Sequence, residues 1–440
     1  MKVDGEETLC QAKREGVRGL LAPWLALVRW RNVLFQCVHL GLGGVLSMVL
    51  WLTLARCWGA GPFGRFNFLY AYAATWGILF DFGLDLLLTR FVSARGGGIP
   101  SSLIRVKAGV LAVGYLLCLA TARWAGWAEF PVLAVLAAGV ALFSVTTFVN
   151  GFLRGMERLD VEAGISLAQK VTFMIPALLG VLYAQQSLAW VAAAYMGSHV
   201  LGLMATMAYV WPRPEFRVMG KLAFPLKDSF RASFSFWLIS LFTIAGQRLD
   251  LFMLQALGTE EQVGLYSAAF RIVEGFVYFQ VAFMAGFFPR LVQRAGDDKE
   301  FGAIVKRSAG LLFFGGLLVA AINQLCAPVW VPVLFGEEFR ASAAALQALG
   351  WSLPCLYTSA VLGHALVACG RQRLFMAALL VALLANGGLD RMLIPLWGLR
   401  GAVAGFCCRE GLLLMLLGTF YLGVRSGRFS GTGRSRGVAF

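Results

Sequence analysis

Long apolar segments recur along nearly the whole chain, and they restrict its fold more than any other feature. A helix needs about 20 mainly apolar residues to cross the hydrocarbon core of a bilayer. Twelve segments of the 440-residue chain reach that length, namely 32–56, 66–93, 103–124, 128–152, 161–184, 188–211, 231–257, 263–289, 305–333, 341–369, 373–397 and 399–423. The pattern predicts an all-α polytopic membrane protein. Pro328 and Pro332 interrupt segment 305–333, which leaves a re-entrant end open there.

Composition excludes the other common classes of protein. Apolar residues make up 59% of the chain and charged residues 14%, against roughly 45–50% and 25% in soluble domains. These values exclude an ordinary cytosolic enzyme, a nucleic-acid binder and a disordered chain. Most of the nine cysteines lie in apolar runs and no CxxC occurs, so neither a zinc site nor a disulfide framework is expected.

The basic residues predict the orientation of the spans. With twelve spans, 28 of the 38 Lys and Arg residues fall in the termini and one set of alternate connections, six fall in the other set, and four lie inside spans. Cytoplasmic loops carry an excess of Lys and Arg, so both termini are predicted to be cytoplasmic. The arm 1–31 lacks the apolar core of a signal peptide and is predicted to be retained. A basic pore for an anionic substrate is a second source of the net charge of +15.

The chain divides into two halves of six spans. The predicted parts are an N-lobe with helices 1–6 (32–211), a linker (212–230), a C-lobe with helices 7–12 (231–424) and a basic tail (425–440). Segments 54–68 and 254–268 share a glycine, a short polar gap and a Gly-x-aromatic motif. Arg90 and Arg290 end equivalent spans, and Gly-x-x-Arg recurs at Gly155 and Gly370. These matches predict a duplication, an arrangement that places the site of a transporter between its repeats. Tight turns between helices are the alternative explanation.

Four basic residues inside the spans are candidate substrate-binding residues: Lys170, Arg248, Arg271 and Arg409. A charge at the centre of a membrane helix costs at least ~2.5–3.5 kcal/mol, so such a side chain faces protein or water and usually has a function. Arginine binds phosphate bidentately, whereas the ammonium of Lys170 suits a phosphate or a carboxylate as a point charge. The alternative for Arg409 and Glu410 is that they only neutralise neighbouring charges across a helix interface.

Four carboxylates are candidate ligands for a coupling ion: Asp81, Asp85, Asp250 and Glu274. The spacing of Asp81 and Asp85 predicts that both lie on one helix face, where like charges favour a proton or a sodium ion. Pairing with Arg90 is the alternative. Glu274 shares a face with Arg271, three residues before it. Arg248 and Asp250 diverge, so only one of them is expected to face a pore. A static interhelical ion pair would explain the same residues.

Catalytic and cofactor motifs are missing from the sequence. No P-loop or HExxH occurs, and we predict neither an enzyme nor a bound cofactor, so ATP bound to this chain would not power transport. His39, His199 and His364 stand alone in apolar helices and are predicted to be packing residues rather than proton relays.

Several segments together resemble a known family. They include LTLARCWGAGPFGRF (52–66) with its continuation to residue 96, NGFLRGMERLDVEAGISLAQKV (150–171), the region 248–291, and VLFGEEFRASAAALQAL (333–349) followed by ACGRQR (368–373). The chain resembles the O-antigen flippases, which are polysaccharide exporters of the multidrug/oligosaccharidyl-lipid/polysaccharide superfamily. Arg248, Asp250 and Arg271 fall where such flippases carry charged groups on their seventh and eighth helices.

The resemblance implies a MATE-like fold with two pseudo-symmetric six-helix lobes around a cationic cavity. It implies that a glycan linked to polyprenyl pyrophosphate is flipped across a bacterial or archaeal cytoplasmic membrane by alternating access. A proton or sodium gradient would supply the energy. The implied partners are this lipid-linked glycan, membrane lipids and other polysaccharide-assembly proteins, with no nucleic acid.

Two rival functions stay open. A multidrug or toxin extrusion antiporter on the same architecture would favour an acidic, aromatic cavity, and the four basic residues inside spans argue against it. A membrane polymerase or scaffold of envelope assembly would be expected to carry a large outer loop, whereas the longest loop here has about 20 residues.

Overall fold

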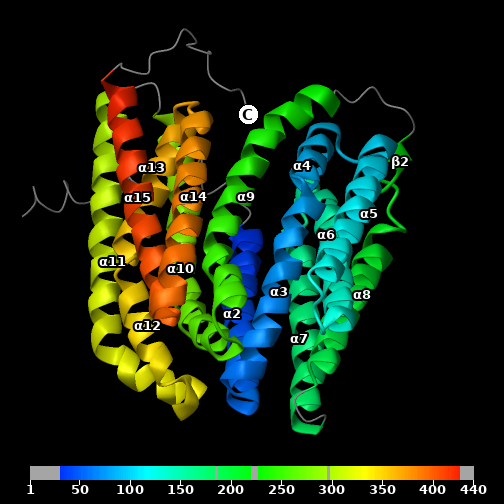
Figure 1. The fold of residues 1–440 in the computed structure, drawn as a ribbon. Helices are drawn as coiled ribbons and strands as arrows, with labels where there is room; N and C mark the ends of the chain where they lie inside the picture. Colours follow the sequence, from blue (N-terminus) through cyan, green and yellow to red (C-terminus); the bar gives the residue numbers. More distant parts are fainter. Residues whose placement is uncertain (1–29, 184–186, 220–225, 295–297, 427–440) are drawn as a thin grey trace, which may run out of the picture.

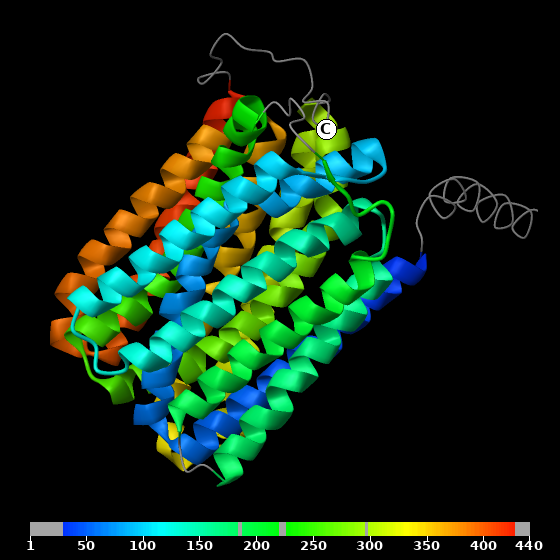
Figure 2. The ribbon, with the colours of Figure 1, turned by 90° about the vertical axis from the view of Figure 1, so that its right-hand side faces the viewer.

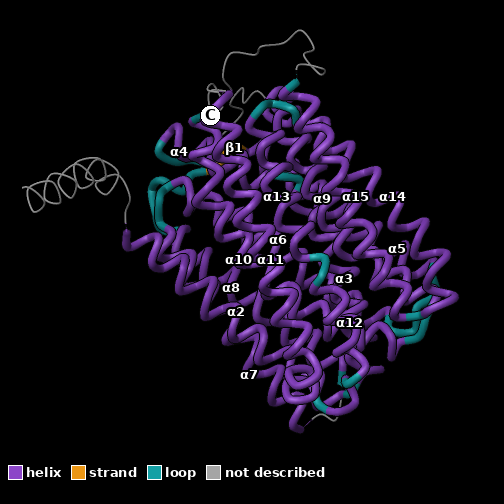
Figure 3. The backbone as a smooth tube through the Cα atoms, turned by 90° about the vertical axis from the view of Figure 1, so that its left-hand side faces the viewer, coloured by secondary structure: helices purple, strands orange, loops and turns teal. Residues whose placement is uncertain are grey.

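The computed structural model describes residues 30–183, 187–219, 226–294 and 298–426, and nearly all of them are helical (Figure 3). The first half of the chain forms α2 (Trp30–Trp58), α3 (Ala60–Asp81), α4 (Leu84–Arg95), α5 (Ser101–Trp124), α6 (Phe130–Gly155), α7 (Leu159–Tyr183) and α8 (Leu188–Val210). The second half forms α9 (Leu226–Leu257), α10 (Glu260–Gln293), α11 (Asp298–Phe335), the 3-10 helix η1 (Glu337–Phe339), α12 (Ala341–Gly350), α13 (Leu353–Ala368), α14 (Gln372–Trp397) and α15 (Leu399–Arg425). The predicted arm and tail lie, except for their innermost residues, outside the described part.

Each predicted span coincides with a helix or with a bent pair of helices. Nine helices of the described chain are long and apolar enough to cross a membrane. The spans 66–93 and 341–369 are bent pairs, α3 with α4 at 42° and α12 with α13 at 41°. α10 has 34 residues and covers the predicted span 263–289, but it does not pass the same test of apolarity. The protein is therefore a multi-pass membrane protein of the all-α class.

Two local expectations are wrong. α11 runs unbroken through Pro328 and Pro332, so the predicted span 305–333 is not re-entrant. Proline is tolerated in membrane helices because neighbouring groups satisfy the carbonyls that it frees. The second span breaks instead, at Phe82 and Gly83, where φ is 45° and 69°. Both values lie in the left-handed region, which cannot continue an α-helix.

The helices form two lobes that lie side by side with nearly parallel long axes (Figures 1 and 2). We call α2–α8 the N-lobe and α9–α15 the C-lobe. A short parallel strand pair, β1 (Ile99–Pro100) with β2 (Val218–Met219), joins the loop after α4 to the linker between the lobes. The core of each lobe consists of apolar side chains from facing helices.

The lobes meet backbone to backbone where α3 crosses α10. A Cβ atom on Gly264 would overlap the carbonyl oxygen of Ala60, and one on Gly64 would overlap that of Glu260. Only glycine permits this approach. α3 begins the second span of the N-lobe, and α10 forms the second span of the C-lobe. Gly64 and Gly264 lie 200 residues apart, which is also the offset between Arg90 and Arg290 in the two halves of the sequence.

Polar contacts hold the same crossing. Arg65 Nη2 lies 2.7 Å from Glu260 Oε2, and the backbone N–H of Ala60 donates to Glu338 Oε1 at 2.9 Å. We call this set of residues, together with Gly64 and Gly264, the α3–α10 contact. It lies at the end of the molecule that carries the α2–α3 and α9–α10 turns, which we call the turn end (Figure 1).

Candidate functional site

Arg248, Arg271 and Glu274 come together between the lobes. Arg248 Nη2 of α9 lies 2.8 Å from Glu274 Oε1, and Arg271 Nη1 of α10 lies 2.9 Å from Glu274 Oε2. One carboxylate therefore bridges two guanidinium groups and leaves one positive charge uncompensated. The three side chains are 16–23% exposed. We call these residues the Arg–Glu–Arg triad.

The N-lobe reaches the triad through Arg271. Asn67 Oδ1 of α3 accepts a hydrogen bond of 3.0 Å from Arg271 Nη2, and the guanidinium carbon lies 4.1 Å from the ring centroid of Trp51 on α2. Arg271 Nε is buried and finds no hydrogen-bond partner among the described residues. Arg271 thus links both lobes and keeps a donor unused. Guanidinium groups are suited to binding the oxygens of carboxylates and phosphates in pairs.

Asp250 points the other way, into the C-lobe, which confirms that it diverges from Arg248. Asn386 Nδ2 donates to Asp250 Oδ1 at 3.1 Å and to Asp390 Oδ2 at 3.1 Å. All three side chains are fully buried. Asp250 Oδ2, Asn386 Oδ1 and Asp390 Oδ1 have no hydrogen-bond partner within the described chain. We call this group the Asp250–Asp390 site. Its unused atoms are oxygens, the ligand type that hard cations prefer.

Arg409 lies beside the Asp250–Asp390 site rather than between the lobes. Its guanidinium is hydrogen-bonded to Glu410, the next residue on α15, and both side chains are buried. Electrostatic interactions also connect Arg409 with Asp250 and Asp390. One guanidinium thus faces three carboxylates, those of Asp250, Asp390 and Glu410. This excess of carboxylates suits a proton or a monovalent cation.

The break in the second span separates Asp81 from Asp85. Asp81 Oδ1 pairs with Lys107 Nζ of α5 at 3.1 Å, and Asp85 Oδ2 pairs with Arg154 Nη1 of α6 at 3.2 Å. The prediction that both lie on one continuous helix face is wrong, and Arg90 takes part in neither pair. Each carboxylate has a cation of its own, supplied by a neighbouring helix.

Lys170 lies in a cavity inside the N-lobe. The cavity encloses about 430 Å³ and is bordered by residues of α2, α3, α6, α7 and α8. Lys170 Nζ donates to the carbonyl oxygen of Gly43 at 3.0 Å and lies 3.4 Å from Ser47 Oγ. Within the described part of the chain, no carboxylate forms an ion pair with Lys170. Tyr70 borders both this cavity and the triad.

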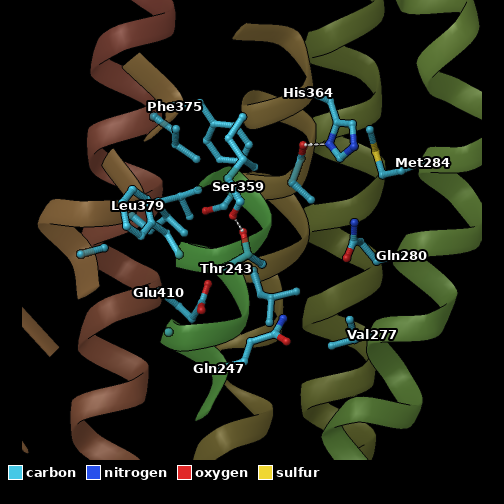
Figure 4. A pocket seen from close by; sticks show the side chains of 18 of the residues that line it. Thr243, Gln247, Val277, Gln280, Met284, Ser359, His364, Phe375, Leu379 and Glu410 are labelled. Carbon is cyan, nitrogen blue, oxygen red and sulfur yellow. Dashed lines mark hydrogen bonds between the residues drawn. The ribbon is translucent and has the colours of Figure 1, made fainter. Parts of the chain in front are cut away.

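A larger cavity of about 670 Å³ lies inside the C-lobe (Figure 4). Its walls come from α9, α10, α13, α14 and α15, and most of its lining is apolar. Gln247, Gln280 and His364 contribute polar groups, and Arg409 with Glu410 also line it. His364 Nδ1 contacts the carbonyl oxygen of Ala360 at 2.7 Å, as expected of a packing residue.

The other two histidines lie on helices of the N-lobe, His39 on α2 and His199 on α8. His199 is buried in the N-lobe, and its Nδ1 is hydrogen-bonded to the side-chain amide of Gln169. The side chain of His39 lies outside the described residues.

Sequence reasoning misses Asp390, Asn386, Lys107 and Asn67. The signal for Asp390 was present, because it is a carboxylate inside the predicted span 373–397, but Arg391 beside it makes the position look like a helix end. Lys107 was counted with the cytoplasmic charges although it lies in an apolar helix. Asparagine carries no comparable signal, since uncharged amides are common in membrane helices.

Comparisons with known proteins agree with this architecture. A multidrug resistance MATE family transporter of the MOP superfamily, in its inward-facing conformation, has 15% identity and a TM-score of 0.72, over 91% of this chain and 100% of that one. The lipid II flippase MurJ, in an inward closed conformation, has 12% identity and a TM-score of 0.66, over 90% of each chain. The outward-facing conformation of a MATE family transporter has 14% identity and a TM-score of 0.54, over 92% of this chain and 90% of that one.

These structures confirm the expected MATE-like fold with two six-helix lobes. Among curated proteins, none matches the chain. The family model described as polysaccharide biosynthesis protein matches residues 29–294, which is more than half of the chain. The chain therefore belongs to the polysaccharide biosynthesis protein family, and its fold is that of the transporters of the MOP superfamily.

Proposed function

We propose that the protein flips a polyprenyl-pyrophosphate-linked oligosaccharide across a bacterial or archaeal cytoplasmic membrane. The glycan would be a repeat unit of O-antigen or of another surface polysaccharide. The Arg–Glu–Arg triad carries this proposal, because it places two guanidinium groups between the lobes with one charge uncompensated. Pyrophosphate is the most anionic part of such a lipid, and guanidinium groups bind phosphate oxygens in pairs. Membership of the polysaccharide biosynthesis protein family supports a glycan as the transported group.

Glu274 gives the triad a way to bind and release an anion. Its carboxylate occupies the place between Arg248 and Arg271 that a phosphate would take. An entering pyrophosphate replaces the carboxylate, and Glu274 returns when the lipid leaves. The exchange avoids leaving two guanidinium groups unpaired in an apolar environment, which would be costly.

The α3–α10 contact is proposed to be the outer gate. In the orientation predicted from the loop charges, the turn end faces the outside of the cell. A closed turn end corresponds to a state that accepts substrate from the cytoplasm. The higher TM-score with the inward-facing transporter (0.72) than with the outward-facing one (0.54) supports this assignment. Parting of Gly64 from Gly264 would then release the glycan outside.

The Asp250–Asp390 site is the proposed coupling site. It is buried, it lies on α9 and α14, and α9 also carries Arg248 of the triad. A proton or sodium ion bound between the two carboxylates would neutralise part of their charge and change the packing of α9. Asp250 and Arg248 are two residues apart, so a shift of α9 reaches both sites at once.

The experiment that tests this function follows a fluorescent polyprenyl-pyrophosphate oligosaccharide in liposomes containing the purified protein. We expect protein-dependent flipping that Arg248→Ala and Arg271→Ala each reduce by at least about tenfold, since each removes a charge-assisted contact. Arg340→Ala is the matched control, because Arg340 is exposed and its one ion pair among the described residues is with Glu337. Flipping that persists in both triad variants would overturn the assignment.

Extrusion of drugs or toxins is the second candidate function. The apolar C-lobe cavity with the buried carboxylate of Glu410 favours it, because a hydrophobic cation would fit there. The same liposomes loaded with a cationic dye distinguish the two functions. Dye efflux without movement of any glycan would replace the flippase by an extrusion antiporter.

A further inference from the structure

We propose that the N-lobe cavity is the subsite for the sugars of the substrate, and that Lys170 there selects glycans with a carboxylate-bearing sugar. The proposal rests on the proposed flippase function and names the class of glycan. Four observations on the cavity carry it: its cation without a counter-charge, its unpartnered polar atoms, its aromatic walls and its position next to the triad.

The ammonium of Lys170 is held in place without a counter-charge. Its two hydrogen-bond contacts in the described chain are neutral, the carbonyl of Gly43 and the hydroxyl of Ser47. Gly43 makes room for it, since a Cβ atom at that position would come within 2.9 Å of Lys170 Nζ. Arg154, which borders the same cavity, is by contrast paired with Asp85 and Glu162. An unpaired ammonium in a partly buried site favours an anionic ligand.

Three further residues present unpartnered polar atoms in the same cavity. Asn150 Oδ1, Glu162 Oε2 and His199 Nε2 are buried and have no hydrogen-bond partner within the described residues. The three residues are 6–7% exposed. Buried polar groups are normally satisfied, so these atoms indicate a ligand or water that is hydrogen-bonded there. Sugar hydroxyls can donate to the oxygens of Asn150 and Glu162 and can serve either tautomer of His199.

Aromatic rings form the wall between the cavity and the triad. The ring centroid of Tyr70 lies 5.3 Å from that of Trp51 and 5.6 Å from that of Tyr195. All three residues line the cavity. A mixture of aromatic surface with a few placed polar groups is the usual lining of a small-molecule site, and 430 Å³ falls in the range of roughly 300–1,000 Å³ for such sites.

The cavity lies next to the triad, with Trp51 and Tyr70 between the two. Trp51 borders the cavity and also contacts the guanidinium of Arg271, and Tyr70 borders both spaces. A pyrophosphate at the triad would therefore place the first sugars beside Trp51 and Tyr70, with Lys170 beyond them. A carboxylate on one of these sugars would pair with the ammonium.

Equilibrium binding to the full-length protein in nanodiscs tests the selectivity. The two probes are polyprenyl-pyrophosphate disaccharides that differ in one group, a glucose with CH₂OH at C6 and a glucuronic acid with a carboxylate there. We expect the acidic probe to bind at least about tenfold more tightly, which is the effect of one hydrogen bond to a charged group. Lys170→Met is expected to bring the ratio of the two Kd values to about one, and Lys170→Arg to keep part of it.

Two other variants test the site without removing the lysine. Gly43→Ala crowds the ammonium while retaining its charge, so the ratio of Kd values should fall several-fold. Asn150→Asp adds a carboxylate to the cavity and should lower the ratio further. Lys306→Met is the control, because Lys306 is exposed and lies on α11, a helix of the C-lobe. It should keep the ratio of the natural sequence.

The outcomes separate the two proposals. Equal binding of both probes to the natural protein, or a ratio unchanged in Lys170→Met and in Gly43→Ala, would overturn the subsite while leaving the flippase in place. Absence of binding by either probe, or binding of both that Arg271→Ala leaves unchanged, would overturn the proposed function itself.

Discussion

The two lobes enclose cavities of different character, although they share one helix pattern. The N-lobe cavity, about 430 Å³, contains Lys170 without a carboxylate partner in the described chain. The C-lobe cavity, about 670 Å³, is mainly apolar, and its guanidinium, that of Arg409, is bonded to Glu410. The charge of the N-lobe is free to meet a ligand, whereas that of the C-lobe is compensated internally.

The difference teaches that a duplicated scaffold constrains the backbone more than the side chains. The repeats still match where the backbones touch, at Gly64 and Gly264, because a larger residue on either side would separate the helices. The charged residues of the two cavities, Lys170 and Arg409, lie outside that contact, and they differ between the lobes. In our proposals the N-lobe recognises the glycan and the C-lobe senses the ion.

The largest effect is expected from removing the cation of the C-lobe. Arg409→Leu leaves Glu410, Asp250 and Asp390 buried without a compensating guanidinium and should destabilise the protein by about 3–5 kcal/mol. Lys170→Met in the N-lobe has no carboxylate to strand and should cost less than about 1 kcal/mol. Unfolding in detergent with denaturant measures both. Equal losses would mean that Lys170 is as structural as Arg409, and the contrast between the lobes would fail.

The next effect concerns the position at which the repeats agree. Gly264→Val places side-chain atoms against the carbonyl of Ala60 and should destabilise the closed turn end by about 1–3 kcal/mol. That cost corresponds to a shift of roughly 5–150-fold in the population of the two states. Labelling of a cysteine introduced beside Arg65 should become faster from the outside. Gly275→Val on the same helix is the control, because a Cβ atom there meets open space.

Ion dependence tests whether coupling belongs to the C-lobe alone. Asp390→Asn removes a carboxylate from the Asp250–Asp390 site. The increase in flipping rate that an imposed proton or sodium gradient causes should therefore fall about tenfold. Asp85→Asn in the N-lobe should keep the response, because Asp85 is paired with Arg154 and Arg154 retains Glu162. Flipping rates with and without each gradient provide the measurement. A response lost in Asp85→Asn and kept in Asp390→Asn would reverse the assignment.

The smallest effects are expected from substitutions that fill each cavity with a larger side chain. Ala360→Leu adds apolar volume to the C-lobe cavity and should stabilise the protein by about 0.5–1 kcal/mol without slowing flipping. Ser166→Leu in the N-lobe cavity should slow flipping several-fold, because it occupies the space proposed for sugars. Thermal unfolding and the liposome assay read the two effects. Slower flipping in Ala360→Leu would place the substrate in the C-lobe.

Much of the architecture was predictable because membrane spans obey strong local rules. Each of the twelve predicted spans is a helix or a bent pair in the structure. The backbone must satisfy its own hydrogen bonds in lipid, so apolar length almost dictates helix. The errors fall where local rules are weak, at Pro328 and Pro332 within an unbroken helix and at the break between Asp81 and Asp85.

The candidate site was predictable only in part. The cost of charge in the membrane singles out Arg248, Arg271 and Glu274, and the structure brings them together. It brings Asp250 to Asn386 and Asp390 instead, on a helix more than 130 residues away in the chain. It gives Asp81 and Asp85 separate partners. Spacing within one helix says which side chains diverge, but it cannot say which neighbouring helix each one meets.

The sequence by itself determined the membrane class, the positions of the long apolar helices and the residues whose charge demands a partner. These follow from hydropathy, from helix periodicity and from the cost of charge in lipid, which act within a single segment. Only the tertiary structure decided which charges pair, which polar atoms stay without partners and which cations stay free. Those properties depend on contacts between segments far apart in the chain, such as α3 with α10 and α9 with α14.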